Sequence, residues 1–422
     1  MGQRVFARSQ PLTTLFPSAF GKCVSCGTRS IKSMENEKEK KRFASAIKSF
    51  NIEFDKNEDE NLDFNKVSAY FQENYPCWKA YISDDDYQED LGQALIRYSY
   101  SILHHQYSKL DETDIRDLLQ KTEEFKIVAS KKWNILESLY FNIAIGWNRI
   151  GHLYNSLSVD AFKHHIYYVI QKECRRQYSN FSFYKFYKCS EPYVIQSLAN
   201  ETLSVSDPSK YNDIFDCPLL SILKTDGTDL GKLLLQAYNE CLKVACFVRN
   251  KVLSPISSGK IKKYNSNVPE YLNTLMWAHY ADSHKGICIK YTFPNIPLQK
   301  SGENAECCSL FKDVLYVKSL NSTILEPIKK NNETDTLSAF FTKADIWKYE
   351  NEVRLLNVNV KGKGEHENIP IPNAVEAIYF GVNCSDDDIK MIKNVMSNKT
   401  NVTFYRMVKD DKCFGKIKDV CI

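Results

Sequence analysis

Two glutamates and an arginine have the residue types and the spacing of a site that works on a charged sugar. Glu350, Glu352 and Arg354 are two residues apart, so on a strand their side chains share one face. Cleavage of a glycosidic bond to a cationic leaving group builds positive charge on the sugar ring. A fixed carboxylate stabilises that charge and accepts a hydrogen bond from a ribose hydroxyl. The same residues also suit a salt-bridged structural cluster, and both interpretations stay open.

Aromatic and histidine side chains earlier in the sequence are candidates for holding a nucleotide. Trp277 and Trp347 offer flat surfaces on which nicotinamide or adenine can stack, although tryptophans also anchor cores. His279 and Tyr280 can donate hydrogen bonds to a ribose or a phosphate. For His279 the alternative is a buried histidine that ties two strands together.

Short polar residues form a third candidate group. Asn212, Asp213 and Asp216 are typical of a turn closed by side-chain-to-backbone hydrogen bonds, and they are also candidates for substrate contact. A metal-dependent nuclease is an alternative function, in which Asp213, Asp216, Glu350 and Glu352 would hold a divalent ion. The glycosidic chemistry needs no metal, and we expect none.

Four blocks of the second half together resemble a widespread, poorly characterised bacterial domain family. The blocks are a strand with a lysine (Phe183–Tyr187), a turn (Tyr211–Asp216), W-x-H-Y-x-x-x-H-x-G-x-C-I (Trp277–Ile289) and K-x-x-x-W-x-Y-E-x-E-x-R (Lys343–Arg354). The resemblance runs from about residue 181 to about residue 406. Ile214 stands where the family usually has proline. The family carries no settled activity.

The order of these blocks is more distantly similar to the ADP-ribosyltransferase superfamily, above all to its DNA-targeting toxin branch. There, a histidine or arginine on the first strand holds NAD, and a glutamate that opens a late strand acts on the ribose. The resemblance implies that Lys185 takes the first position and Glu352 the catalytic one. It also implies that His279, Tyr280 and Arg354 hold NAD. A lysine in place of arginine weakens bidentate holding of phosphate.

The periodicity predicts two halves of different structure. Residues 34–178 place apolar residues at i, i+3, i+4 and i+7, which is typical of helices. Residues 181–422 contain short apolar and alternating runs, such as Gly286–Tyr291 and Glu352–Val360, with helices between them, one of them over Thr336–Ala344. We therefore predict an α+β protein. An all-helical domain precedes a mixed, mostly antiparallel sheet with flanking helices, and the second resemblance implies an ADP-ribosyltransferase-like fold.

Composition narrows the class of protein. Basic and acidic residues are nearly equal in number, and the net charge of +4 does not by itself indicate nucleic-acid binding. The sequence contains no run of about 18 apolar residues, so no membrane-spanning helix is predicted. The 14 cysteines are scattered, which favours free thiols in a reducing, cytoplasmic location. Residues 1–33 contain no acidic residue and are predicted to be a disordered extension, with Met34 as an alternative start to Met1.

The leading functional hypothesis is a bacterial effector or toxin, in a setting such as phage defence. It would use NAD to move ADP-ribose onto a protein or nucleic-acid acceptor. A recognition module that binds a nucleotide or nucleic acid without turnover is the alternative from another class, beside the nuclease. The helical half would bind a partner or sense a signal, or would only stabilise the chain.

Overall fold

The computed structural model describes residues 33–57, 64–82, 84–105, 110–174, 182–189, 191–211, 213, 216–249, 273–293, 306–319 and 337–422. Contacts between Cα atoms divide the chain into two compact units, Met1–Val169 and Ile170–Ile422. The predicted extension, residues 1–33, lies outside the described residues except for Ser33, which begins the first helix.

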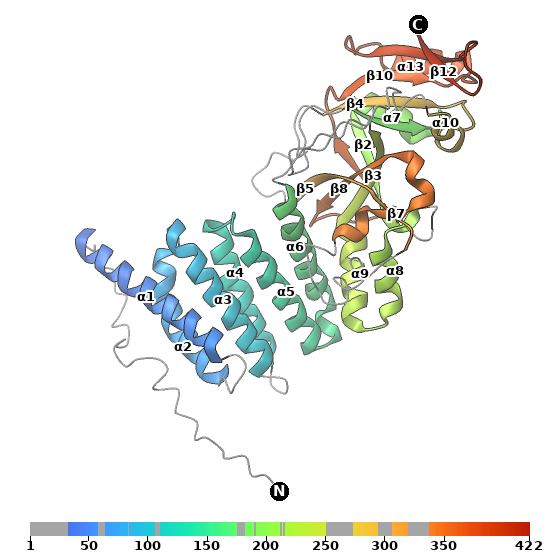
Figure 1. The fold of residues 1–422 in the computed structure, drawn as a ribbon. Helices are drawn as coiled ribbons and strands as arrows, with labels where there is room; N and C mark the ends of the chain where they lie inside the picture. Colours follow the sequence, from blue (N-terminus) through green and yellow to red (C-terminus); the bar gives the residue numbers. More distant parts are fainter. Residues whose placement is uncertain are drawn as a thin grey trace, which may run out of the picture. The chain divides into compact units, whose positions relative to one another are not determined.

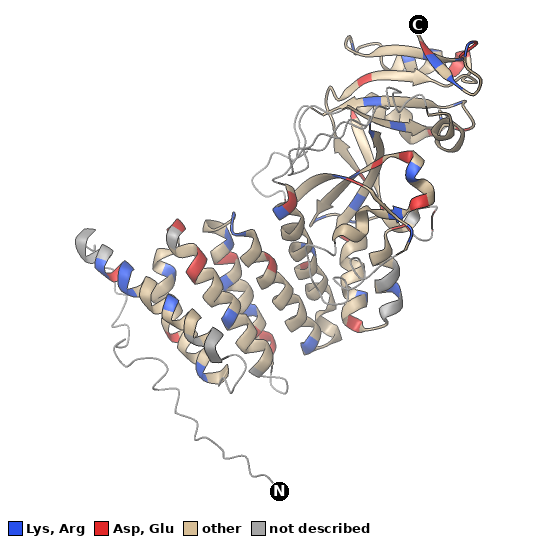
Figure 2. Ribbon diagram, in the orientation of Figure 1, with Lys and Arg blue, Asp and Glu red and all other residues tan. Residues whose placement is uncertain are grey.

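The first unit is helical, as predicted. Its helices, of which the last crosses the unit boundary, are α1 (Ser33–Asn57), α2 (Phe64–Trp78), α3 (Asp85–His105), α4 (Glu112–Val128), α5 (Trp133–Ile150) and α6 (Asn155–Glu173). Their apolar stripes are buried; on α5, for example, Leu136, Leu139 and Ile143 have no exposed surface. Asp111 caps α4 through a reciprocal capping box with Asp114. Acidic and basic residues are interspersed along these helices (Figure 2).

The second unit is built on a ten-stranded sheet. Its strands are β1 (Ser182–Tyr187), β2 (Thr202–Ser206), β3 (Leu242–Arg249), β4 (Ile287–Thr292), β5 (Cys307–Asp313), β8 (Glu352–Asn359), β9 (His366–Pro370), β10 (Val375–Phe380), β11 (Thr403–Lys409) and β12 (Ile417–Cys421). The main path runs β12-β11-β10-β4-β1-β3-β2-β9, with β8 between β3 and β5. Within this sheet only β10 and β11 are parallel, which confirms the mixed, mostly antiparallel prediction.

Helices pack against the sheet (Figure 1), and its strands bury side chains in two separate cores. On β1, Phe183 and Tyr187 join one core with residues of α7 (Pro192–Asn200) and α13 (Asp386–Val395). Tyr184 and Phe186 join a second core with residues of α10 (Thr274–Tyr280). Two helices, α8 (Pro218–Asp226) and α9 (Asp229–Cys241), lead into β3.

The sheet splits along one edge of β3. Near its end, Val248 and Arg249 pair with β1, whereas near its start Val244 pairs with Ser206 of β2. Residues 245–247 therefore have no ladder partner on this edge, although their other edge is fully paired with β8. Backbone groups at such a split must find other partners.

Two predictions about elements were wrong or incomplete. The segment predicted as a helix over Thr336–Ala344 instead forms a 3₁₀ helix, η7 (Leu337–Phe341), followed by a short strand, β7 (Thr342–Ala344). This strand pairs in parallel with β6 (Leu315–Val317). The central strand β3 was not predicted, because it is buried on both faces and its sequence does not alternate. Within the described residues, the helices are too short or too polar to cross a bilayer.

Candidate functional site

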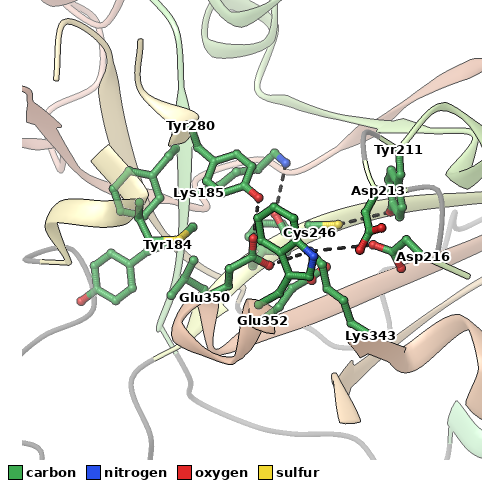
Figure 3. Close-up of a pocket in the computed structure, with 15 residues that line it drawn as sticks. Tyr184, Lys185, Tyr211, Asp213, Asp216, Cys246, Tyr280, Lys343, Glu350 and Glu352 are labelled. Atoms are coloured by element: carbon green, nitrogen blue, oxygen red, sulfur yellow. Dashed lines mark hydrogen bonds and ion pairs between the residues drawn. The ribbon is translucent and has the colours of Figure 1, made fainter. Parts of the chain in front are cut away.

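A cavity of about 240 Å³ opens beside the split in the sheet. It is lined by residues of β1, β3, α10 and β8, by the turn before α8, and by the 3₁₀ helix η8 (Asp345–Glu350) with the preceding lysine. The lining residues are Tyr184, Lys185, Phe186, Tyr211, Asp213, Asp216, Cys246, Phe247, Val248, Met276, Tyr280, Lys343, Trp347, Glu350 and Glu352 (Figure 3). The cavity thus combines aromatic walls with a charged wall.

The centre of the charged wall is the ammonium group of Lys343. Its Nζ lies 2.6 Å from Oε2 of Glu350, 3.3 Å from Oε2 of Glu352 and 3.8 Å from Oδ2 of Asp216. Tyr280 donates a second hydrogen bond to Glu350, at 2.5 Å (Figure 3). Lys343 also lies over the ring of Trp347, 5.0 Å from its centroid.

Arg354 holds the other side of the same cluster. Its guanidinium is fully buried and forms ion pairs with Oε1 of Glu352 and Oδ1 of Asp216, both at 2.7 Å. It also donates to the backbone oxygen of Phe340 at 2.7 Å. Two cations therefore bind three carboxylates among buried side chains, an arrangement that is stable only while every partner is present.

The two glutamates are in opposite protonation environments. Burial opposes the ionisation of Glu352, but Arg354 and Lys343 outweigh it and hold the pKa of this carboxyl at about 2. For Glu350, burial dominates and raises the pKa above its ordinary value despite Lys343 and Tyr280. Glu352 is thus a fixed negative charge at neutral pH, and Glu350 is the more basic carboxylate of the pair.

The pKa shifts of Glu352 and Glu350 predict how the free energy of unfolding depends on pH. Because the pKa of Glu352 is lowered from 4.5 to about 2, its contribution is fully present above pH 4.5 and is lost as the pH falls toward 2. Glu352→Gln should flatten the acid limb of a plot of unfolding free energy against pH. Glu350→Gln is the matched control. Because the pKa of Glu350 is raised in the folded wild type, the wild type loses stability as the pH rises above 4.5. Glu350→Gln should therefore change the curve only above pH 4.5. Parallel curves for the wild type and Glu352→Gln between pH 2 and 4.5 would contradict the assignment.

Lys185 reaches the cavity from β1, on the other side of the split. Its Nζ donates to the backbone oxygen of Cys246 at 3.1 Å, at the stretch of β3 that lacks a ladder partner. Among the described residues, it makes no ion pair with a carboxylate. Burial lowers the pKa of this ammonium group, with the charge of Glu352 acting in the opposite direction. An anion that binds beside Lys185 would stabilise the charged form of its ammonium group.

The prediction that Glu350 and Glu352 share a strand face was wrong. Glu350 ends η8, Asn351 adopts a left-handed conformation with φ of 48°, and only Glu352 belongs to β8. The two carboxylates nevertheless meet, because the chain reversal at Asn351 directs both to Lys343. Arg354 shares the face of Glu352 on β8, as the two-residue spacing predicted.

The other predicted site residues are distributed between the cavity and its surroundings. Asp213, Asp216 and Tyr280 line the cavity, whereas Asn212 lies outside the described residues. Trp277 is fully buried in a core, 5.3 Å from the ring of Phe186 in an edge-on contact, and is not part of the lining.

His279, on the exposed side of α10, also lies outside the lining. The second tryptophan candidate, Trp347, does line the cavity. It is half-buried in the wall, and its ring faces the ammonium group of Lys343.

Sequence reasoning missed Lys343, Tyr211 and Cys246. Lys343 stands first in the K-x-x-x-W-x-Y-E-x-E-x-R block, so its fixed place before the two glutamates was a usable signal. Tyr211 and Cys246 come together through β3, where the thiol lies 3.2 Å from the tyrosine hydroxyl. No spacing in the sequence predicts this contact, because the two residues are far apart along the chain.

The acidic residues of the cavity do not form a metal centre in the described part of the chain. There, the only three potential ligands whose donor atoms lie within 4.8 Å of one another are Cys189, Cys384 and Asp388, away from the cavity lining. Three of the nuclease carboxylates, those of Asp216, Glu350 and Glu352, are instead bound to Lys343 or Arg354. A divalent ion would have to displace these cations.

The fold and this site define an α+β protein with a charged, aromatic-walled cavity at a split sheet. A family profile described as "Protein of unknown function (DUF2971)" matches residues 276–355, which contain most of α10, all of η8 and the start of β8. This match supports the resemblance to a poorly characterised family, over a narrower part of the chain than residues 181–406. No curated protein and no solved structure matches the chain.

Proposed function

We propose that the cavity binds NAD and that the protein transfers the ADP-ribose part of NAD to a protein or nucleic acid. The observation that best supports this is that Lys185 and Glu352 line the same cavity. Among the described residues, Lys185 is a cation without a carboxylate partner, and Glu352 is a carboxylate that is held ionised. The lysine suits the pyrophosphate, and the carboxylate suits the ribose next to nicotinamide.

The reaction breaks the bond between C1′ of the ribose and the nicotinamide nitrogen. The electron pair of this bond leaves with nicotinamide, and positive charge develops on C1′ and the ring oxygen. Glu352 stabilises this charge because it stays ionised. A nucleophilic atom of the acceptor then bonds to C1′, and its proton passes to Glu350, whose raised pKa makes it the better base.

The walls of the cavity suit the uncharged parts of the substrate. Tyr184, Phe186 and Trp347 offer aromatic surface for nicotinamide. Tyr280 already donates to Glu350, and in this role it fixes the orientation of the base. Trp277 and His279 are not used in the proposal, since neither lines the cavity.

Release of nicotinamide from NAD, with cell lysate as the source of acceptor, tests the proposal. The wild type should release nicotinamide, and Glu352→Gln should reduce the rate about 100-fold, as is typical when a preorganised charge is removed from a reacting centre. Each variant is first checked for a native circular dichroism spectrum. Equal rates for a folded Glu352→Gln variant and the wild type would exclude the assigned role.

Nucleotide or nucleic-acid recognition without turnover is a second candidate function. It is favoured by the ion pairs of Glu352, whose oxygens are both bound to Arg354 or Lys343 and are thus occupied. Saturable binding of NAD without release of nicotinamide would support recognition over transfer.

A further inference from the structure

Two buried thiols and a carboxylate come together in the second unit, in a cluster that the proposed function does not use. Cys189 lies in the turn after β1, Cys384 lies between β10 and α13, and Asp388 is in the first turn of α13. The Sγ atoms are 3.9 Å apart, and the three donor atoms all lie within 4.8 Å of one another. The cysteines are only 6% and 2% exposed.

The distance between the thiols fits a shared metal ion. Two thiolates bound to a tetrahedral zinc ion at ~2.3 Å lie about 3.8 Å apart, close to the distance between Cys189 and Cys384. A disulfide would require the sulfur atoms to approach to ~2.05 Å. The cluster is thus arranged as a pair of ligands with a third ligand beside them.

The surrounding structure holds the three ligands in place. Ser385 donates to Oδ2 of Asp388 at 2.6 Å, which fixes the carboxylate and leaves its other oxygen for a metal. The backbone amides of Gly381 and Asn383 donate to the oxygens of Gly286 and His284, both at 2.9 Å, and so fix the loop that carries Cys384. A side chain at Gly381 would meet the oxygen of His284 at 2.0 Å, so this packing requires glycine.

Other contacts of the thiols are weak. Cys189 donates to the oxygen of Lys285 at 3.6 Å, and Cys384 to the oxygen of Ser385 at 3.8 Å. The guanidinium of Arg406 donates to the backbone oxygen of Cys384 at 3.2 Å and forms an ion pair with Asp386 at 2.8 Å.

We propose that Cys189, Cys384 and Asp388 bind one zinc ion, with a water molecule as the fourth ligand. Binding forms two zinc–sulfur bonds and one zinc–oxygen bond, and it releases to solvent the protons that the thiols carry. Asp388 is only half-buried, which leaves room for the water. The ion would join the end of β1, four residues beyond Lys185, to α13, so zinc should raise the thermal stability of the sheet.

The test uses the reduced, chelator-stripped full chain, with zinc uptake measured by competition with a chromogenic chelator. The wild type should bind one more zinc equivalent than Cys384→Ser, and Co²⁺ should give thiolate-to-metal absorbance in the wild type that is lost in Cys384→Ser. Asp388→Asn, at a half-buried position, should fold normally and bind zinc at least tenfold more weakly. Cys288→Ser, which removes a thiol buried in β4, is the matched control and should bind as the wild type does.

Two results would overturn the zinc site. One is equal zinc uptake and equal cobalt absorbance in the wild type, Cys384→Ser and Asp388→Asn. The other is a Cys189–Cys384 disulfide, found by peptide mass mapping after mild oxidation, in a chain that takes up no zinc when reduced. Neither result bears on nicotinamide release, so the zinc site and the proposed function fail independently.

Discussion

Replacing Arg354 with methionine is expected to lower the free energy of unfolding of the second unit by about 3–5 kcal/mol. The guanidinium is fully buried and pairs with Glu352 and Asp216 at 2.7 Å. Methionine fills much of the same volume but leaves two buried carboxylates with Lys343 as their only cation in the cluster. The loss of one partner from a buried ion cluster costs far more than a surface ion pair contributes.

Hydrogen exchange of the β8 amides measures this change, because it reports on the second unit separately from the helices. Arg406→Met is the matched control. Arg406 is also on a strand and pairs with Asp386, whose side chain is 87% exposed, so its loss should change the free energy by about 0.5 kcal/mol or less. A loss below about 1 kcal/mol in Arg354→Met would show that the cluster is not energetically coupled in this way.

Replacing Lys185 with methionine is expected to weaken NAD binding about 30-fold or more while leaving the protein as stable as before, or more stable. Among the described residues, the ammonium of this half-buried side chain has one hydrogen bond, to Cys246, and contacts with aromatic rings, but no carboxylate partner, so its charge is incompletely compensated in the free protein. When an anion binds, the lysine supplies a short-range charge interaction worth ~2 kcal/mol or more. Stability and binding should therefore change in opposite directions.

Calorimetric titration with NAD and urea unfolding measure the two effects. Because burial lowers the pKa of Lys185, the wild type should gain stability as the pH rises toward 10.5, and Lys185→Met should lack that gain. Lys290→Met is the matched control on the neighbouring strand β4, where the lysine pairs with the partly exposed Glu376. Equal NAD affinity in the wild type and Lys185→Met would remove this lysine from the site. Clear destabilisation would show that it is a structural residue.

The periodicity of the sequence was sufficient for the elements whose pattern is local. The helices of residues 34–178 were predicted because their apolar faces repeat with the period of a helix, and strands β1, β4, β8 and β10 because their side chains suit a pleated sheet. The blocks around Trp277 and Lys343 indicated where chemistry would gather, and several of their members do line the cavity. Arg354 was placed beside Glu352 correctly, since two residues on one strand share a face.

The tertiary structure alone decided how these pieces combine. Lys185 and Glu352 belong to one cavity because both β1 and β8 pair with β3, a strand that no local pattern indicated. Glu350 and Glu352 meet at Lys343 because Asn351 reverses the chain, and Trp277 is in a core because α10 covers the sheet. Local patterns along the chain indicated which residues are chemically suited to a site and which elements carry them. The pairing of distant strands decided which of these residues meet, because hydrogen bonds between strands depend on register rather than on neighbours along the chain.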